Sequence, residues 1–258
     1  MSTLNYQITG SGTTVILIHG LFGDLDNLKA LGNSLSEHQV IRVDLPNHGK
    51  SPHWDAMDYP SLAQAMVNLL DQLNIKQAHF VGHSMGGKVA MAVALLHPSY
   101  VKSLVVADIA PVTYHRRHDT VFNGLNSLDV AHLSGRSEAL GQLVASGIDE
   151  GTAQFLLKNL QREATGFSWK MNLNGLQACY EKLIGWELNS QQTLNYSGPA
   201  LCIRGADSDY VTAAHSQAFI QQFPAIQAKS LAGTGHWLHV QKPAIFNRLI
   251  AEFIDSND

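Results

Sequence analysis

Residues 82–87 read Gly82-His83-Ser84-Met85-Gly86-Gly87. An apolar run typical of a strand, Ala78–Val81, leads into this segment, and an apolar run typical of a helix, Lys88–His97, follows it. A G-x-S-x-G motif in this context forms a tight turn, in which the glycines two residues before and after the serine relieve crowding and leave its hydroxyl exposed at the tip. The motif predicts Ser84 as a nucleophile. The alternative interpretation is a chance match in a glycine-containing loop.

Short apolar runs alternate with helical patterns on both sides of this motif. The runs expected to be strands are Leu4–Ile8, Val15–Ile18, Val40–Val43, His79–Val81, Val101–Ala107, Ala200–Ile203 and Ala228–Leu231. One helix presents an apolar face from Leu62 to Leu73, with Ser61 and Gln64 as its expected capping box, and others are expected near Ala213–Phe223 and Pro243–Ile254. This alternation predicts an α/β fold with a mostly parallel, twisted sheet and helices on both faces.

The strand signal disappears between about residues 111 and 196, where the helical patterns are Glu138–Ala145, Asp149–Leu160 and Leu173–Leu183. We therefore predict a core of residues 1–110 and 197–258 and a helical lid of residues 111–196. Such an insertion usually covers the carboxyl edge of the strands, where open α/β sheets bind ligands. Phe155, Leu156, Trp169 and Trp186 either line a pocket under this lid or form the core of the lid itself.

The composition excludes several classes of protein. The chain has 258 residues, of which 45% are hydrophobic and 15% charged, and its formal net charge of −4 argues against nucleic acid as the main partner. The longest apolar run, Val89 to Leu96, is too short to span a membrane, and residues 1–6 do not resemble a secretory signal. Cys179 and Cys202 suggest neither a metal site nor a disulfide framework. We expect a cytoplasmic protein without a metal or cofactor, and the sequence does not indicate an oligomeric state.

A second glycine-containing loop follows the predicted strand Val15–Ile18 and reads His19-Gly20-Leu21-Phe22-Gly23. A hydroxyl that attacks a carbonyl generates an oxyanion, which backbone N–H groups must stabilise. We predict Met85, directly after the nucleophile, and Leu21 as the two donors, with Phe22 as the alternative to Leu21. The competing interpretation is a plain strand-to-helix turn.

His236 is the predicted general base among the 13 histidines of the chain. A serine hydroxyl is a weak nucleophile and needs a base nearby. His236 follows the last predicted strand and lies after Ser84 in the chain, as the order Ser…Asp…His of this kind of site requires. We expect His83 to be a packing residue and His19 to have an orienting role.

Four segments together resemble the α/β-hydrolase superfamily along nearly the whole chain: residues 19–23, Asp44–Ser51, residues 82–87 and Gly235-His236-Trp237. Within it, the stretch His19–Asn27 and the segment Asp108-Ile109-Ala110-Pro111 are most similar to the small bacterial YbfF-type esterases. This resemblance implies an α/β-hydrolase fold and the hydrolysis of carboxylic esters, with acyl thioesters as further candidate substrates.

The sequence offers more than one candidate for the acid of the expected triad. Most members of the superfamily carry it three residues beyond the glycine that ends the strand Ala200–Ile203, and this position holds Ser208, between Asp207 and Asp209. Asp108 ends the strand that follows the nucleophile strand, and the YbfF resemblance implies this position for the acid. We predict Asp108, with Asp207 and Asp209 as alternatives, and expect Ser208 near the imidazole or Asp108.

A basic cluster, Tyr114-His115-Arg116-Arg117-His118, begins the predicted lid and is either an anion site for a phosphate-bearing acyl carrier or a solvated helix start. His115 and His118 lack further ligands for a metal. The cluster also supports a second hypothesis, in which the protein is a lyase or C–C hydrolase of the menaquinone-pathway type. A third hypothesis is a non-catalytic binding module of the same fold. The presence of both Ser84 and His236 argues against it.

Overall fold

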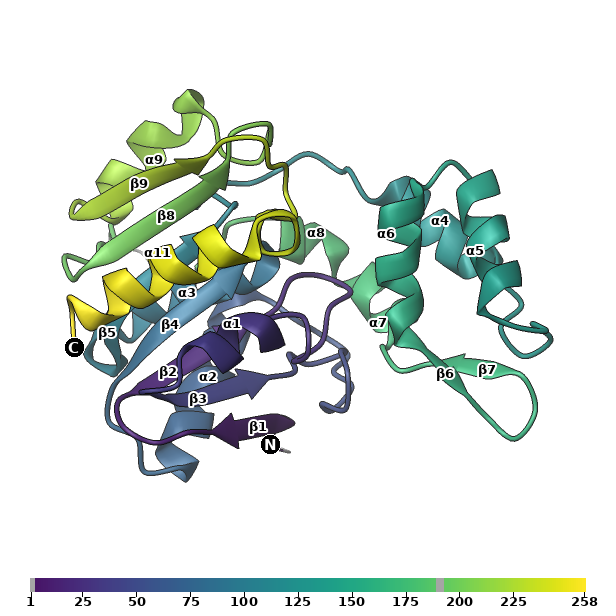
Figure 1. The fold of residues 1–258 in the computed structure, drawn as a ribbon, viewed down its shortest axis with the longest axis horizontal. Helices are drawn as coiled ribbons and strands as arrows, with labels where there is room; N and C mark the ends of the chain where they lie inside the picture. Colours follow the sequence, from purple (N-terminus) through teal and green to yellow (C-terminus); the bar gives the residue numbers. More distant parts are fainter. Residues whose placement is uncertain (1–2, 189–192) are drawn as a thin grey trace.

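A seven-stranded sheet forms the centre of the larger lobe of the molecule (Figure 1). The computed structural model describes residues 3–188 and 193–258. The strand order is β1-β3-β2-β4-β5-β8-β9; β1 pairs antiparallel with β3, and all other pairs are parallel. The strands are β1 (Tyr6–Thr9), β2 (Thr14–Ile18), β3 (Gln39–Val43), β4 (Ala78–His83), β5 (Val101–Ala107), β8 (Ala200–Gly205) and β9 (Ile226–Leu231). The predicted mostly parallel sheet is confirmed.

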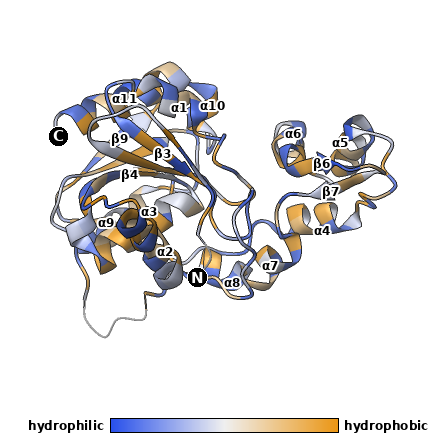
Figure 2. Cartoon of the chain, turned by 90° about the horizontal axis from the view of Figure 1, so that it is seen from below, coloured by the Kyte–Doolittle hydropathy of each residue, from blue (hydrophilic) through white to orange (hydrophobic). Residues whose placement is uncertain are grey.

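Helices cover both faces of this sheet (Figure 2). One face is covered by α1 (Lys29–Ser34), α10 (Leu238–Gln241) and α11 (Pro243–Asp255), and the other by α2 (Tyr59–Gln72), α3 (Met85–Leu96) and α9 (Ser216–Gln222). Short 3₁₀ helices occupy Pro98–Tyr100 and Ala213–His215.

Two hydrophobic cores follow from the alternation of side chains along the strands. In β2, Val15 and Leu17 pack into the core that includes α11, whereas Ile16 and Ile18 pack into the core that includes α2 and α3. Every residue of β2 is buried. This explains why the strand reads as a continuous apolar run instead of an alternating one.

The segment between β5 and β8, called the insertion below, stands to one side of the sheet (Figure 1). It contains the helices α4 (Asp119–Ser127), α5 (Arg136–Ala145), α6 (Glu150–Leu156), α7 (Leu173–Ala178) and α8 (Tyr180–Ile184). Figure 1 shows α4, α5 and α6 together, with α7 and α8 between them and the sheet. Residues 189–192, which the predicted lid range includes, lie outside the described residues, as do residues 1 and 2.

The insertion differs from its predicted helical pattern in two places. The expected helix Asp149–Leu160 ends at Leu156 and continues as a 3₁₀ turn, Leu157–Asn159. A hairpin of β6 (Leu160–Arg162) and β7 (Phe167–Trp169) follows, so the expectation of no strand here is wrong. Three-residue strands are too short to produce a periodic signal. The expected helix Leu173–Leu183 is divided into α7 and α8 at Cys179.

The capping box of α2 also differs from the prediction. The helix begins at Tyr59, and Asp58 is its N-cap, accepting a hydrogen bond of 2.9 Å from the Ser61 backbone N–H. Ser61 is thus the third helical residue, and its hydroxyl accepts from the Asp58 backbone N–H. Pro60 lies in the first turn, where a missing N–H is tolerated, and this allows the helix to start before Ser61.

Candidate active site

Ser84 occupies the tight turn between β4 and α3. Its backbone has φ 54° and ψ −124°, a conformation that a non-glycine residue rarely adopts. A Cβ atom at Gly82 would lie 2.2 Å from the carbonyl oxygen of Gly86, and one at Gly86 would lie 2.3 Å from the carbonyl oxygen of Ile18. Both positions therefore require glycine, and the turn places the serine side chain at the carboxyl edge of the sheet.

His236 and Asp108 form a hydrogen-bonded pair at the same edge. Nδ1 of His236 lies 2.8 Å from Oδ2 of Asp108, whose side chain is fully buried. The other carboxylate oxygen, Oδ1, accepts a bond of 3.0 Å from the backbone N–H of Gly205. The hydroxyl of Ser208 also donates to Oδ2. Because a carboxylate only accepts, Nδ1 carries the proton and Nε2 of His236 is left with a lone pair.

The two alternative acids make other contacts. The side chain of Asp209 is 77% exposed and pairs with the guanidinium of Arg117 at 3.1 Å. Asp207 is exposed, and its backbone N–H donates to the carbonyl oxygen of Thr234. The geometry thus brings Asp108, and not its two competitors, to the imidazole of His236.

Aromatic side chains hold the imidazole of His236 in place. The ring of Tyr210 stacks on it, with centroids 3.7 Å apart and planes inclined by 15°. The ring of His83 lies 4.8 Å away, and its Nε2 is 2.8 Å from the His236 carbonyl oxygen. Burial lowers the pKa of His83 well below its usual value and lowers the pKa of His118 and of His239 to about 4. These three neighbours are therefore neutral at pH 7.

Two backbone N–H groups beside Ser84 are available for an oxyanion. Met85 is the first residue of α3, so its N–H has no acceptor within the helix. The N–H of Leu21 has no hydrogen-bond partner among the described residues. The N–H of Phe22, the alternative donor, is bonded to Nε2 of the buried His48 at 3.2 Å, and burial lowers the pKa of His48 to about 3. His48 therefore remains a neutral acceptor, and the contact favours Leu21 over Phe22.

The predicted orienting residue His19 holds the loop that carries Leu21. Its Nε2 accepts from the backbone N–H of Leu45 at 3.0 Å, and its Nδ1 lies 2.8 Å from the carbonyl oxygen of Gly20. Burial lowers the pKa of His19, so the neutral ring can accept on one nitrogen and donate on the other.

A cavity of about 310 Å³ opens beside Ser84. It is lined from the core by Leu21, Phe22, Ser84, Tyr210, His236, Trp237 and His239, and from the insertion by residues that include Val121, Ile148, Phe155 and Leu156. The cavity therefore lies between the sheet edge and the insertion. Ser84 Oγ makes no hydrogen bond to His236 within the described part of the chain, and such bonds commonly tighten only when substrate is present.

Of the four residues considered for a pocket under the lid, Phe155 and Leu156 line the cavity, whereas Trp169 and Trp186 do not. Trp169 lines a separate surface hollow with Met171. Trp186 packs against Tyr59 and under the ammonium of Lys88. Tyr210, His239 and Lys88 were not predicted because a single residue in a loop, in a four-residue helix or in an apolar helix leaves no pattern in the sequence.

The two arginines of the basic cluster at the start of the insertion are paired with carboxylates. Arg116 pairs with Asp119 at 2.6 Å and also with Glu181. Arg117 lines the cavity, pairs with Asp209 and lies over the ring of Tyr210, 4.3 Å from its centroid. Among the described residues, no group of three or more His, Cys, Asp or Glu side chains could hold a metal ion. No helix within residues 3–188 or 193–258 is long and apolar enough to cross a membrane.

Comparison with known families matches residues 13–243 to the alpha/beta hydrolase fold. The chain belongs to the α/β-hydrolase family. Esterase YbfF of Escherichia coli K12 is 38% identical to this α/β-hydrolase over 247 residues, which are 95% of this chain and 94% of the relative. The sn-1-specific diacylglycerol lipase ABHD11 of Mus musculus is 35% identical over an alignment of 263 residues, gaps included, which covers 97% of this chain and 85% of the relative.

A solved structure of a marine microorganism esterase is also similar to this α/β-hydrolase. It is 34% identical, superposes with a TM-score of 0.93, and the match covers 97% of this chain and 99% of the other. The predicted α/β-hydrolase fold and the predicted similarity to YbfF-type esterases are confirmed.

Proposed function

We propose that this α/β-hydrolase cleaves carboxylic esters through an acyl-enzyme on Ser84, with His236 as general base and Asp108 as the acid that orients it. The esterase and lipase relatives, which match nearly the whole chain, bear out the prediction of a carboxylic ester hydrolase. The observation that carries the proposed roles is the 2.8 Å contact between His236 Nδ1 and Asp108 Oδ2, at the edge of the cavity that Ser84 lines.

The reaction begins when Ser84 Oγ attacks the ester carbonyl carbon and His236 Nε2 accepts the hydroxyl proton. Asp108 holds the proton on Nδ1, so that Nε2 is the basic nitrogen, and stabilises the imidazolium that forms. The N–H groups of Leu21 and Met85 stabilise the oxyanion. Removing one such donor typically costs about 10²–10³ in kcat.

The second half of the reaction returns the enzyme to its starting state. His236 gives its proton to the departing alcohol, which leaves Ser84 acylated. A water molecule then attacks the acyl-enzyme with His236 again as the base, and the acid product departs. Acyl thioesters enter the same sequence with a thiol as the leaving group, and we include them in the proposed substrate class.

We further propose that the insertion acts as a lid on this site. Phe155 and Leu156 on α6 and Val121 on α4 line the cavity opposite the sheet edge. A substrate in the cavity would be shielded from water by these apolar side chains, which strengthens the electrostatic interactions that stabilise the oxyanion.

The proposal is tested with a fluorophosphonate probe and a panel of aryl esters assayed beside acyl thioesters. The wild type should be labelled once, at Ser84, and Ser84→Ala should lose labelling and about 10⁵–10⁶ in kcat. His236→Ala should fall to a similar level because nucleophile and base act as a unit. Full labelling of the Ser84→Ala protein would contradict the assignment of the nucleophile.

A further inference from the structure

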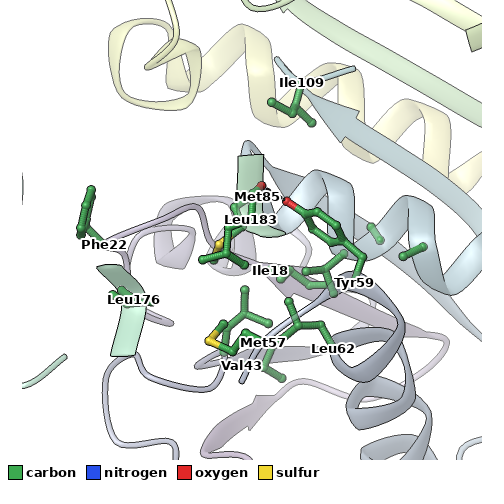
Figure 3. Packing of buried hydrophobic residues seen from close by; sticks show 14 of the residues in the cluster. Ile18, Phe22, Val43, Met57, Tyr59, Leu62, Met85, Ile109, Leu176 and Leu183 are labelled. Carbon is green, nitrogen blue, oxygen red and sulfur yellow. Dashed lines mark hydrogen bonds between the residues drawn. The ribbon is translucent and has the colours of Figure 1, made fainter. Parts of the chain in front are cut away.

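A second, smaller cavity of about 40 Å³ adjoins Ser84. Its walls include Tyr59, Met85, Ile109 and Leu183, which Figure 3 labels, and Lys88. In that view Tyr59, Met85 and Leu183 lie together, and Phe22, which lines the large cavity, lies apart from them.

The two cavities differ in which catalytic groups they contain. Ser84 and Leu21 line both, as do Arg117, His118 and Tyr210. His236 lines only the large cavity, and Met85, the other oxyanion donor, lines only the small one. The site is thus divided at Ser84 into a side with the base and a side without it.

The chemistry of acyl transfer assigns a part of the substrate to each side. When the ester bond breaks, His236 gives its proton to the leaving oxygen, so that oxygen must lie on the side of His236. The carbonyl oxygen points to the N–H groups of Leu21 and Met85. The acyl chain takes the remaining direction from the tetrahedral carbon, away from His236.

We propose that the small cavity is the acyl pocket and the large cavity holds the leaving group, so that the preferred substrates are esters or thioesters of short acids with bulky alcohols or thiols. This inference rests on the proposed function and adds the substrate class. A cavity needs roughly 10–15 Å³ of accessible space for each water-sized group. About 40 Å³ then accommodates roughly three or four such groups, so acyl chains up to about butyryl, with three carbons beyond the carbonyl carbon, fit the cavity.

Contacts between the core and the insertion keep the small cavity from expanding. Lys88 is 1% exposed, and its Nζ donates to the carbonyl oxygens of Ile184 at 2.9 Å and Gly185 at 2.8 Å. The hydroxyl of Tyr59 donates to the carbonyl oxygen of Leu183. A longer acyl chain would have to separate α3 from the end of α8 and break these bonds.

The test measures kcat/KM on two substrate series with the full-length enzyme. The first series varies the acid from acetyl to decanoyl on 4-nitrophenol, and the second varies the alcohol or thiol of acetate esters from methanol to 2-naphthol and coenzyme A. The wild type should be fastest with two to four acyl carbons and lose at least tenfold by octanoyl. The second series should show no loss as the leaving group grows.

Two variants separate the cavities. Leu183→Ala enlarges only the small cavity and should move the acyl optimum to longer chains by about two carbons. Phe155→Ala enlarges only the large cavity and should change the second series while leaving the acyl optimum in place. Leu183→Val serves the same purpose, with a smaller shift, if Leu183→Ala does not fold.

A wild-type optimum at octanoyl or longer, or a shift of the acyl optimum in Phe155→Ala and not in Leu183→Ala, would overturn the assignment of the cavities. Fluorophosphonate labelling of Ser84 in the same preparations separates this outcome from a failure of the proposed function. A labelled, active enzyme with the wrong chain-length profile contradicts only the cavity assignment, whereas an unlabelled enzyme without esterase activity contradicts the proposed function.

Discussion

Ser208 donates its hydroxyl hydrogen to Oδ2 of Asp108, the same carboxylate oxygen that accepts from Nδ1 of His236. The residue at the place where most relatives are expected to carry the acid is therefore bonded to a carboxylate that comes from a different strand. Oδ1 of Asp108 is bonded to the backbone N–H of Gly205. Both oxygens are thus held in a fully buried position, and the carboxylate has little freedom to rotate.

Replacing Asp108 with asparagine tests the proposed acid. The amide keeps the shape of the side chain but can donate to Nδ1 of His236, which would place the imidazole proton on Nε2 and remove the base. We expect Asp108→Asn to lose ~10³–10⁴ in kcat, by analogy with the best-studied triad. The measurement is kcat with a fast aryl ester, on protein whose fold is verified by circular dichroism.

The matched controls for this variant are Asp207→Asn and Asp209→Asn. Both side chains are exposed, so each change should cost less than about tenfold in kcat. If Asp209→Asn were inactive while Asp108→Asn stayed active, the triad acid would be Asp209, in the loop after β8. Asp108 would then serve only to anchor the insertion.

Ser208→Ala tests how much the additional hydrogen bond contributes. The change removes one donor to Asp108 while the bonds from His236 and Gly205 remain. A hydrogen bond to a charged group contributes roughly 1.5–3 kcal/mol, so we expect kcat to fall by about 10- to 150-fold at most. A loss as large as that of Asp108→Asn would mean that Ser208 does more than hold the carboxylate.

The fold could be predicted because its strands are strongly patterned. Strands buried on both faces, such as β2 and β5, read as apolar runs that helices separate, and this alternation is typical of a parallel sheet. The hairpin of β6 and β7 was missed because each strand has three residues. The true start of α2 was missed because Pro60 allows the helix to begin ahead of Ser61, at a position the pattern did not indicate.

The candidate site could be predicted only where its residues stand at the ends of strands. Parallel strands end at one edge, and the structure accordingly brings Ser84 and His236 to one cavity and Asp108 into contact with His236. The ring of Tyr210 on His236 and the place of Lys88 could not be predicted. Both depend on the paths of loops and of the insertion, which tertiary contacts determine and local sequence does not.

Gly82→Ala should disrupt the turn that presents Ser84. The new Cβ would lie 2.2 Å from the Gly86 carbonyl oxygen, a backbone atom that cannot move away without displacing Ser84. We expect a loss of at least ~1–3 kcal/mol in the free energy of unfolding, measured with urea, and a large loss of kcat. Full activity in this variant would show that the tight turn is not needed.

Gly141→Ala is the matched control for this prediction. Gly141 lies inside α5, and a Cβ atom there would meet nothing within 4 Å. Alanine is a better helix former than glycine, so we expect a gain of about 0.4–1 kcal/mol in the free energy of unfolding and unchanged kinetics. Destabilisation here would show that α5 does not tolerate a side chain at this position.

Lys88 provides a prediction about the pH dependence of stability. Burial lowers the pKa of Lys88 to about 7, from an ordinary value of 10.5. Three aromatic rings face its ammonium: Tyr114 at 4.9 Å, Tyr59 at 5.4 Å and Trp186 at 5.9 Å. Burial raises the pKa of both phenols. Between pH 7 and 10 these tyrosines stay neutral and Lys88 is the group that titrates. A neutral amine still has two hydrogens for the carbonyl oxygens of Ile184 and Gly185.

In this window the unfolded chain binds a proton on Lys88 that the folded chain has released. The free energy of unfolding therefore gains a contribution that rises with pH between about 7 and 10.5, by at most ~1.4 kcal/mol per pH unit. Lys88→Met lacks this group, so the stability of the wild type relative to the variant should increase from pH 7 to 9.5 in urea titrations. All other titrating groups are common to both proteins and cancel in the difference. A constant difference across this range would mean that Lys88 keeps its proton in the folded protein and is stabilised as a cation by the carbonyl oxygens and aromatic rings around it.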